Sequence, residues 1–247
     1  MDTVSSFFYD CGGSYNMGSK NAFIVVDVQN DFLPGGALAV PEGDQIIPVI
    51  NTLVELPFDF VVGTRDFHPE KHCSFATTWQ KQVGDRIRIG NIEQIMWPEH
   101  CVQGSKGAEF PHKINSFRYH EIISKGTAKN VDSYSTFFDN RRLKSTGLED
   151  HLRNRGIHDV YFAGLATDYC VLYSVRDAVE LGFQVYVVID ACRGINLNPG
   201  DVERAFVEMR QLGAKLVTSQ DVIDRFIQAN PSPTSQTRGN VVSFSRV

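Results

Sequence analysis

The sequence predicts an α/β protein of three layers (αβα), in which helices cover both faces of a central, mostly parallel six-stranded sheet. Six short runs rich in β-branched residues are almost continuously apolar, as strands buried on both faces are. Amphipathic segments of helical period separate these runs, and such alternation is typical of a parallel sheet. The expected strands are Ala22–Val28, Phe58–Gly63, His120–Ser124, Asp159–Gly164, Gln184–Ile189 and Lys215–Thr218.

Helical patterns connect these strands. Thr146-Gly147-Leu148-Glu149 has the form of a capping box, which marks the start of a helix. Gly156 and Gly182 stand where helices commonly end on a glycine. The expected helices cover residues 43–55, 146–155, 168–181, 200–212 and 220–228.

One region, residues 67–118, breaks the alternation. It carries four histidines, two tryptophans and three prolines, and it shows little periodicity. An irregular loop of this length inside a compact domain is usually functional. We therefore expect it to be an active-site loop region.

The length and composition are those of an ordinary globular protein. With 247 residues the chain suits a single domain. We place that domain at 21–228, between a flexible leader (1–20) and a disordered tail (229–247), both poor in apolar periodicity. The net charge of −5 and the lack of a basic stripe argue against nucleic acid as a partner. No apolar run approaches the ~20 residues that span a membrane.

Five cysteines at irregular spacings argue against a disulfide framework and favour a reducing compartment. We expect a cytoplasmic protein. The C-terminal Ser245-Arg246-Val247 approximates the Ser-Lys-Leu address, which makes the peroxisome the alternative. The expected partner is a small-molecule substrate, and a homo-oligomer is left open.

Reactive side chains follow several of the expected strands. Asp27, Asp66, Lys125 and Cys170 all fall at carboxyl ends, where ligands bind in open α/β sheets. Cys170 lies in the first turn of an expected helix, whose partial positive charge would lower the pKa of the thiol. Asp27 would then take the thiol proton, and Lys125 would stabilise the thiolate. The alternative is a buried apolar cysteine beside an ordinary ion pair.

A metal site is also indicated. Asp66 and His68 alternate on an extended segment, so both side chains point to the same side. A carboxylate with imidazoles suits zinc, manganese or iron rather than calcium. His100 is the first candidate for a third ligand and His72 the next. The alternative is a hydrogen bond within a loop.

Aromatic residues occur in the loops after the expected strands. Phe32, Trp97 and Tyr134 would there stack on a planar substrate. Each of them would otherwise be a core residue. The residues alone leave both interpretations open.

Five sequence motifs occur in order between residues 22 and 228. They are Asp27-Val28-Gln29-Asn30-Asp31-Phe32 with Gly35-Gly36-Ala37-Leu38, Thr64–Pro69 with His72, Trp97–Val102, Ser124-Lys125-Gly126 with Tyr134–Phe137, and Gly164–Val171 with Asp190-Ala191-Cys192. Together they resemble the nicotinamidases (pyrazinamidases) of the isochorismatase-like cysteine hydrolases. Phe67, where tryptophan is common, and Tyr169, before the cysteine, depart from the usual pattern.

The resemblance implies the isochorismatase-like hydrolase fold and a metal-assisted cysteine amidohydrolase. Such an enzyme converts nicotinamide to nicotinate and ammonia through a thioester, in NAD salvage. By resemblance, the catalytic triad is Asp27, Lys125 and Cys170. The amides of Ala166 and Cys170 form the oxyanion hole, after a cis Leu165–Ala166 peptide.

The resemblance also implies one divalent metal ion, zinc first, with manganese or iron as alternatives. Its ligands would be Asp66, His68 and His100, and it would bind the pyridine nitrogen. The substrate-binding residues implied are Phe32, Leu38, Trp97, Tyr134, Leu165 and Ala166.

Other functions on the same fold are less compatible with these residues. An isochorismatase needs neither the cysteine nor the metal, and N-carbamoyl amide hydrolases share the triad but not the metal ligands. An amidase of this superfamily with a different substrate, and an inactive, metal-bound ligand-binding protein, remain as alternatives.

Overall fold

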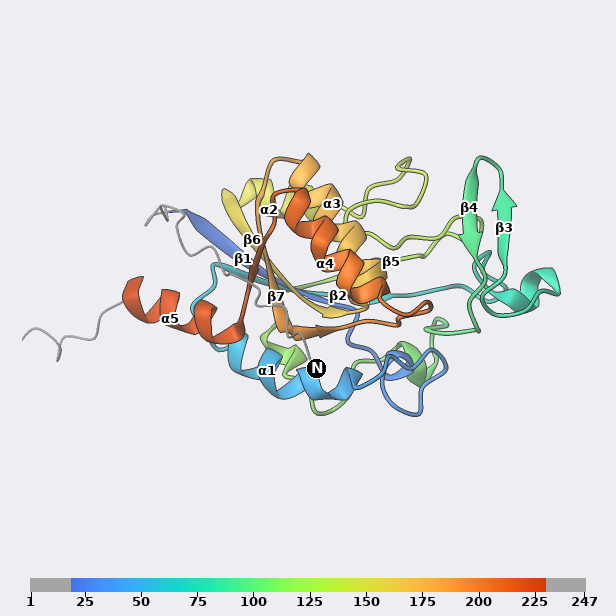
Figure 1. The fold of residues 1–247 in the computed structure, drawn as a ribbon, viewed down its shortest axis with the longest axis horizontal. Coiled ribbons are helices and arrows are strands. Elements are labelled where there is room, and N and C mark those ends of the chain that lie inside the picture. Colours follow the sequence, from blue (N-terminus) through green and yellow to red (C-terminus); the bar gives the residue numbers. More distant parts are fainter. Residues whose placement is uncertain (1–18, 230–247) are drawn as a thin grey trace, which may run out of the picture.

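A six-stranded sheet forms the middle layer of the computed structural model, which describes residues 19–229 (Figure 1). Its order is β5-β2-β1-β6-β7-β8, and every neighbouring pair is parallel. The predicted fold class and all six expected strands are confirmed. The strands are β1 (Lys20–Val26), β2 (Phe60–Asp66), β5 (Glu121–Lys125), β6 (Ile157–Leu165), β7 (Gln184–Arg193) and β8 (Lys215–Val217).

The apolar strands are buried on both faces, as their composition indicates. Successive side chains of a strand point to opposite faces. In β1, Ala22, Ile24 and Val26 accordingly join one core cluster, whereas Phe23 and Val25 join the other. Two cores, one on each face of the sheet, therefore hold the layers together.

The helices divide between the two faces (Figure 1). One face is covered by α1 (Ile46–Leu53) and α5 (Ser219–Ala229), whose apolar residues pack in the core that contains Phe23. The other face is covered by α2 (Leu148–Asn154), α3 (Leu172–Glu180) and α4 (Asp201–Gln211). All five expected helices are present.

Two of the helices begin differently from the prediction. The segment expected as helix 43–55 starts with a 3-10 turn at Gly43–Gln45, and the segment 168–181 starts with a π-helical turn at Thr167–Val171. At the start of α2, Thr146 Oγ1 accepts a hydrogen bond from the amide of Leu148 (3.2 Å), one residue earlier than a capping box requires. The glycine ends are confirmed, with φ of +70° at Gly156 and +82° at Gly182.

The region 67–118 is not irregular throughout. It contains an antiparallel hairpin of β3 (Arg86–Ile89) and β4 (Ile92–Ile95), which stands apart from the main sheet (Figure 1). The alternation of Arg86-Ile87-Arg88-Ile89, followed by the turn pair Gly90-Asn91, was a signal for this hairpin.

The proposed leader and tail lie almost entirely outside the described residues. β1 already begins at Lys20, and α5 ends at Ala229. Between residues 19 and 229 no helix has the length and apolarity needed to cross a membrane. Within the same range Cys73, Cys101, Cys170 and Cys192 are free thiols, and Cys11 lies outside it.

Gly164 makes the close contact between β1 and β6 possible at the edge where the reactive residues gather. Its φ is +124°, and a Cβ there would lie 2.1 Å from the carbonyl oxygen of Val26. We expect Gly164→Ala to lower the free energy of unfolding by about 3 kcal/mol, because backbone atoms on both sides must move. Urea denaturation measures this loss.

Gly213→Ala is the matched control. Gly213 also has a positive φ, +102°, but nothing lies within 4 Å of its added Cβ. We expect it to cost about 1 kcal/mol from the backbone conformation alone. Equal losses in the two variants would show that the contact with Val26 does not restrict position 164.

Candidate active site

The reactive residues lie at the carboxyl ends of four neighbouring strands. Asp27 directly follows β1, Asp66 ends β2, and Lys125 ends β5. Cys170 lies in the π-helical turn that follows β6. Because the sheet order is β5-β2-β1-β6, these ends are adjacent, and the structure brings together all four residues that the sequence placed there.

Lys125 is the centre of this cluster. Its buried ammonium lies 2.8 Å from Asp27 Oδ2 and 2.5 Å from Asp66 Oδ1. It also donates to the carbonyl of Ser133 (2.9 Å) and contacts Cys170 Sγ at 3.4 Å. Burial alone would lower the pKa of Lys125, but the two carboxylates hold it well above its usual range. The lysine therefore stays charged.

Asp27 is held by its neighbour on β2. Its amide donates to the carbonyl of Thr64 (3.2 Å), and Thr64 Oγ1 donates to Asp27 Oδ1 (2.6 Å). Burial raises the pKa of Asp27, and Lys125 opposes that rise. The other carboxylate oxygen, Oδ2, faces Lys125 and makes no further hydrogen bond within the described chain. Asp27 is thus a fixed, buried carboxylate, and Oδ2 is the oxygen placed to take a proton.

Cys170 is a buried thiol whose sulfur lies 3.4 Å from Lys125 Nζ and within 4.8 Å of carboxylate oxygens of Asp27 and Asp66. The sequence predicted a low pKa from the helix terminus, and this prediction is wrong for the structure. Burial raises the pKa of the thiol; Lys125 lowers it, but Asp27 and Asp66 add to the rise. The resting thiol is therefore neutral, and a base must remove its proton before it can attack.

Two buried histidine side chains converge on the other oxygen of Asp66. Its Oδ2 lies 3.7 Å from His68 Nε2 and 3.9 Å from His100 Nε2. His68 Nδ1 and His100 Nδ1 lie 2.9 and 2.8 Å from the carbonyls of Gly126 and Pro98. A carbonyl can only accept, so each Nδ1 carries a proton, and Nε2 is the nitrogen left to face Asp66. This is the tautomer that a metal-ligating histidine requires.

The donor set fits a divalent cation. One carboxylate oxygen and two imidazole nitrogens are the ligands of an open zinc-type site. Burial, together with the nearby His68, lowers the pKa of His100 to about 4, so this ring is neutral as a ligand must be.

His72, the other candidate for a third ligand, is occupied. Its Nδ1 lies 2.8 Å from Ser74 Oγ, and its Nε2 lies 3.2 Å from the carbonyl of Val131. The ring stacks on His68 with centroids 4.2 Å apart. With both nitrogens hydrogen-bonded inside the protein, His72 supports His68, and His100 completes the set.

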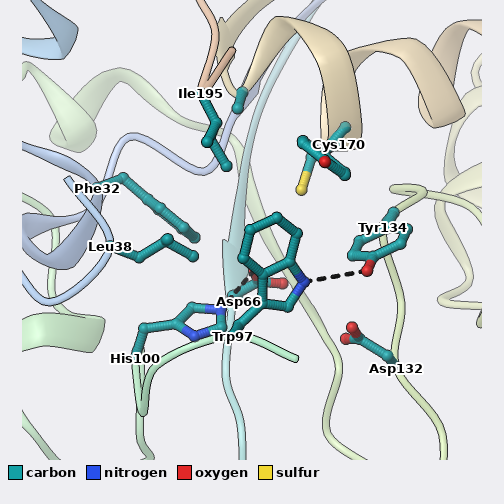
Figure 2. Close-up of a pocket in the computed structure, with 11 residues that line it drawn as sticks. Phe32, Leu38, Asp66, Trp97, His100, Asp132, Tyr134, Cys170 and Ile195 are labelled. Atoms are coloured by element: carbon teal, nitrogen blue, oxygen red, sulfur yellow. Dashed lines mark hydrogen bonds and ion pairs between the residues drawn. The ribbon is translucent and has the colours of Figure 1, made fainter. Parts of the chain in front are cut away.

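A pocket of about 340 Å³, partly open to solvent, lies between this donor set and Cys170 (Figure 2). Of the six residues expected to bind substrate, five line it: Phe32, Leu38, Trp97, Tyr134 and Ala166. Leu165 does not, because its side chain is buried in the core on the α1 face. Residues that sequence reasoning did not place in the pocket also line it: Asp132, Tyr169 and Ile195.

Ile195 had a signal in the sequence. It follows β7, so the rule that placed Asp27 and Asp66 at strand ends applies to it as well. Asp168 fixes its position, because the carboxylate accepts hydrogen bonds from the amides of Ile195 (2.9 Å) and Asn196 (2.8 Å). No sequence signal placed Asp132 in the pocket, because its position depends on contacts with the β3–β4 hairpin, which is distant in sequence.

The turn after β6 has the shape that the resemblance implies. The Leu165–Ala166 peptide is cis, and the carbonyl of Ala166 accepts hydrogen bonds from the amides of Tyr169 and Val171, both at 3.1 Å. This turn carries Cys170 back toward Ala166, and both residues line the pocket.

Comparison with known proteins agrees with this site. A family model described as the isochorismatase domain matches residues 21–221. The nicotinamidase of Escherichia coli (strain K12) is 43% identical over 203 residues, which are 81% of this chain and 95% of that protein.

Two solved structures are similar in fold. The nicotinamidase and pyrazinamidase of Acinetobacter baumanii is 44% identical, with a TM-score of 0.80 over 84% of this chain and 100% of that one. The pyrazinamidase of Pyrococcus horikoshii, solved in complex with zinc, is 40% identical, with a TM-score of 0.64 over 81% of this chain and 99% of its own.

The chain belongs to the isochorismatase family of hydrolases, and the resemblance seen in its motifs is confirmed. Nicotinamidases and pyrazinamidases are among the relatives that it matches over nearly their whole length.

The buried ion pairs of Lys125 should contribute to the stability of the fold. Lys125→Met keeps the length of the side chain but leaves two buried carboxylates without their cation, and we expect the free energy of unfolding to fall by about 3–5 kcal/mol. Lys129→Met, at an exposed position four residues on, is the control and should change it little. A Lys125→Met protein as stable as the control would contradict the ion-pair assignment. Urea denaturation at neutral pH measures both variants.

Proposed function

We propose that this protein hydrolyses nicotinamide to nicotinate and ammonia, with Cys170 as nucleophile. One observation carries the proposal: the thiol of Cys170, beside the buried Asp27, faces a pocket lined by aromatic residues. At its other end lie Asp66 and His100, whose Nε2 is 3.9 Å from Asp66 Oδ2. A planar ring with a nitrogen at one end and a carboxamide at the other matches both ends of such a pocket.

The first half of the reaction forms a thioester. Asp27 takes the thiol proton, and the Cys170 sulfur attacks the carboxamide carbon. The carbonyl oxygen becomes an oxyanion, for which we assign the amides of Ala166 and Cys170 as donors. Asp27 returns the proton to the nitrogen, the C–N bond breaks, and ammonia leaves. Donors of this kind contribute about 3–4 kcal/mol each to lowering such a barrier.

The second half regenerates the thiol. Asp27 takes a proton from a water molecule, which attacks the thioester carbon at the same oxyanion site. The C–S bond breaks, the sulfur regains the proton from Asp27, and the product leaves as nicotinic acid, which gives up the second proton of the water to solvent and becomes nicotinate. Asp27 Oδ2 has no hydrogen bond within the described chain besides its ion pair with Lys125, and burial raises the pKa of Asp27, so this carboxylate can both accept and return a proton.

Lys125 assists both halves of the reaction through its positive charge. It holds Asp27 and Asp66 at 2.8 and 2.5 Å, and it lies 3.4 Å from the sulfur. A positive charge at that distance stabilises the thiolate as it forms. We assign it as the third member of the triad.

We propose that Asp66, His68 and His100 hold one divalent ion, with zinc first and manganese or iron as alternatives. The tautomers of both histidines and the carboxylate between them support this assignment. When bound, such an ion supplies a Lewis-acid contact that would orient the ring nitrogen of the substrate.

The walls of the pocket bind the ring in this proposal. Phe32 and Leu38 lie on one side, and Trp97 and Tyr134 on the other (Figure 2). Flat apolar walls favour a planar aromatic substrate. The backbone at Leu165–Ala166 would contact the carboxamide, since the side chain of Leu165 points into the core.

Cys170→Ala tests the nucleophile. We expect ammonia release from nicotinamide to fall at least about 10³-fold, because no other group forms the thioester. Cys192→Ala, which removes another buried free cysteine outside the pocket, is the matched control and should keep activity. If Cys170→Ala releases ammonia at the wild-type rate, the proposed mechanism fails, and a ligand-binding role becomes the better explanation.

The metal site is tested by metal content. We expect about one divalent ion per purified chain by elemental analysis, and His100→Ala to lower its affinity at least about 100-fold. His72→Ala should retain the ion, because neither nitrogen of His72 is free to ligate. Removing the ion with a chelator should lower nicotinamide hydrolysis while circular dichroism stays unchanged. Full activity in protein shown to be metal-free would refute the assignment.

A further inference from the structure

The side chain of Gln94 is buried at the base of the β3–β4 hairpin, where an apolar residue would be expected. It is 1% exposed, and its Nε2 lies 2.9 Å from the carbonyl of Ile95 and 2.9 Å from Asp132 Oδ2. The same nitrogen lies 3.2 Å from Tyr134 Oη. One amide group therefore connects the hairpin to the loop that carries Asp132 and Tyr134.

The same hydroxyl holds a second pocket residue. Trp97 Nε1 donates to Tyr134 Oη at 3.0 Å, a contact drawn in Figure 2. Tyr134 Oη thus faces two donors, Trp97 Nε1 and Gln94 Nε2, whose two hydrogens are shared among Tyr134 Oη, the carbonyl of Ile95 and Asp132 Oδ2. The two rings come from segments 37 residues apart in sequence, and this shared oxygen fixes them to each other.

Gln94 also accounts for a carboxylate in a pocket wall that is mostly aromatic. Asp132 is buried and lines the pocket. Its Oδ1 accepts from the amide of Ser133 (2.8 Å), and its Oδ2 accepts from Gln94. Without the Gln94 amide, Oδ2 would lose this bond, and a buried acceptor left unpaired is costly. The loop 132–134 would then move away from the hairpin.

We propose that Gln94 is a positioning residue for substrate: its side-chain amide fixes Trp97, Tyr134 and Asp132 as one rigid wall of the pocket. The hairpin, which stands outside the main sheet, thereby becomes part of the substrate site. Gln94 itself is not among the residues that line the pocket, so it acts through the others. The proposal rests on the proposed function for its ligand, but the geometry of the wall exists without any ligand.

Gln94→Met tests the proposal, since it keeps the volume and removes the amide. We expect the KM for nicotinamide to rise about 10-fold while kcat changes less than about 2-fold, because a loosened wall weakens ground-state and transition-state binding alike. Gln82→Met, at an exposed position shortly before β3, is the matched control and should leave KM unchanged. Gln94→Glu keeps the shape but sets a carboxylate against Asp132, and it should raise KM at least as much.

Trp97 fluorescence gives a second readout that needs no turnover. In a Trp79→Phe background the only remaining tryptophan is Trp97. There we expect Gln94→Met to shift its emission to longer wavelength, as water reaches the loosened wall. This shift tests whether Gln94 fixes the pocket wall, even if the wild-type protein proves not to hydrolyse nicotinamide.

A purely structural role gives a different pattern. It would lower the melting temperature of Gln94→Met but leave KM and Trp97 emission at wild-type values, and that outcome would overturn the proposal. A rise in KM of the same size in Gln82→Met would overturn it as well.

Discussion

The buried ion cluster of Lys125 with Asp27 and Asp66 is the constraint on which the site depends. An isolated ammonium in the core would be strongly destabilising, and so would either carboxylate. Together they are tolerated, because three adjacent strands end at the same edge and bring the charges within 2.8 Å of Lys125 Nζ. The strand order that buries the apolar side chains is thus also the order that lets these charges be buried.

Asp66 links the two halves of the site. Its Oδ1 contacts Lys125, and its Oδ2 faces His68 and His100. The Asp66 carboxylate therefore fixes the position of the attacking Cys170 relative to the metal site that would orient the ring. This arrangement gives the pocket a fixed length between the donor set and Cys170, which suits a rigid planar substrate better than a flexible one.

Much of the fold could be predicted, because strands buried on both faces are continuous apolar runs and their ends lie at one edge. The same logic placed Asp27, Asp66, Lys125 and Cys170 together. Contacts between distant segments could not be predicted. The Gln94 amide contacts Asp132 and Tyr134, which are 38 and 40 residues away, and no local sequence pattern indicates such a contact. The pKa of Cys170 was missed for a related reason, since the helix terminus is local but the two opposing carboxylates come from other strands.

The central position of β1 has a consequence for how the protein is made. β1 lies between β2 and β6, and its register pairs Ile24 with Phe162. A chain emerging from the ribosome therefore carries Asp27, Asp66 and Lys125 in water until β6 and the turn with Cys170 arrive. The nucleophile is the last of the four to be synthesised, and the strand before it, β6, is the one that pairs with the remaining edge of β1. The complete group of charges and nucleophile can therefore assemble only after the chain has been made past Cys170.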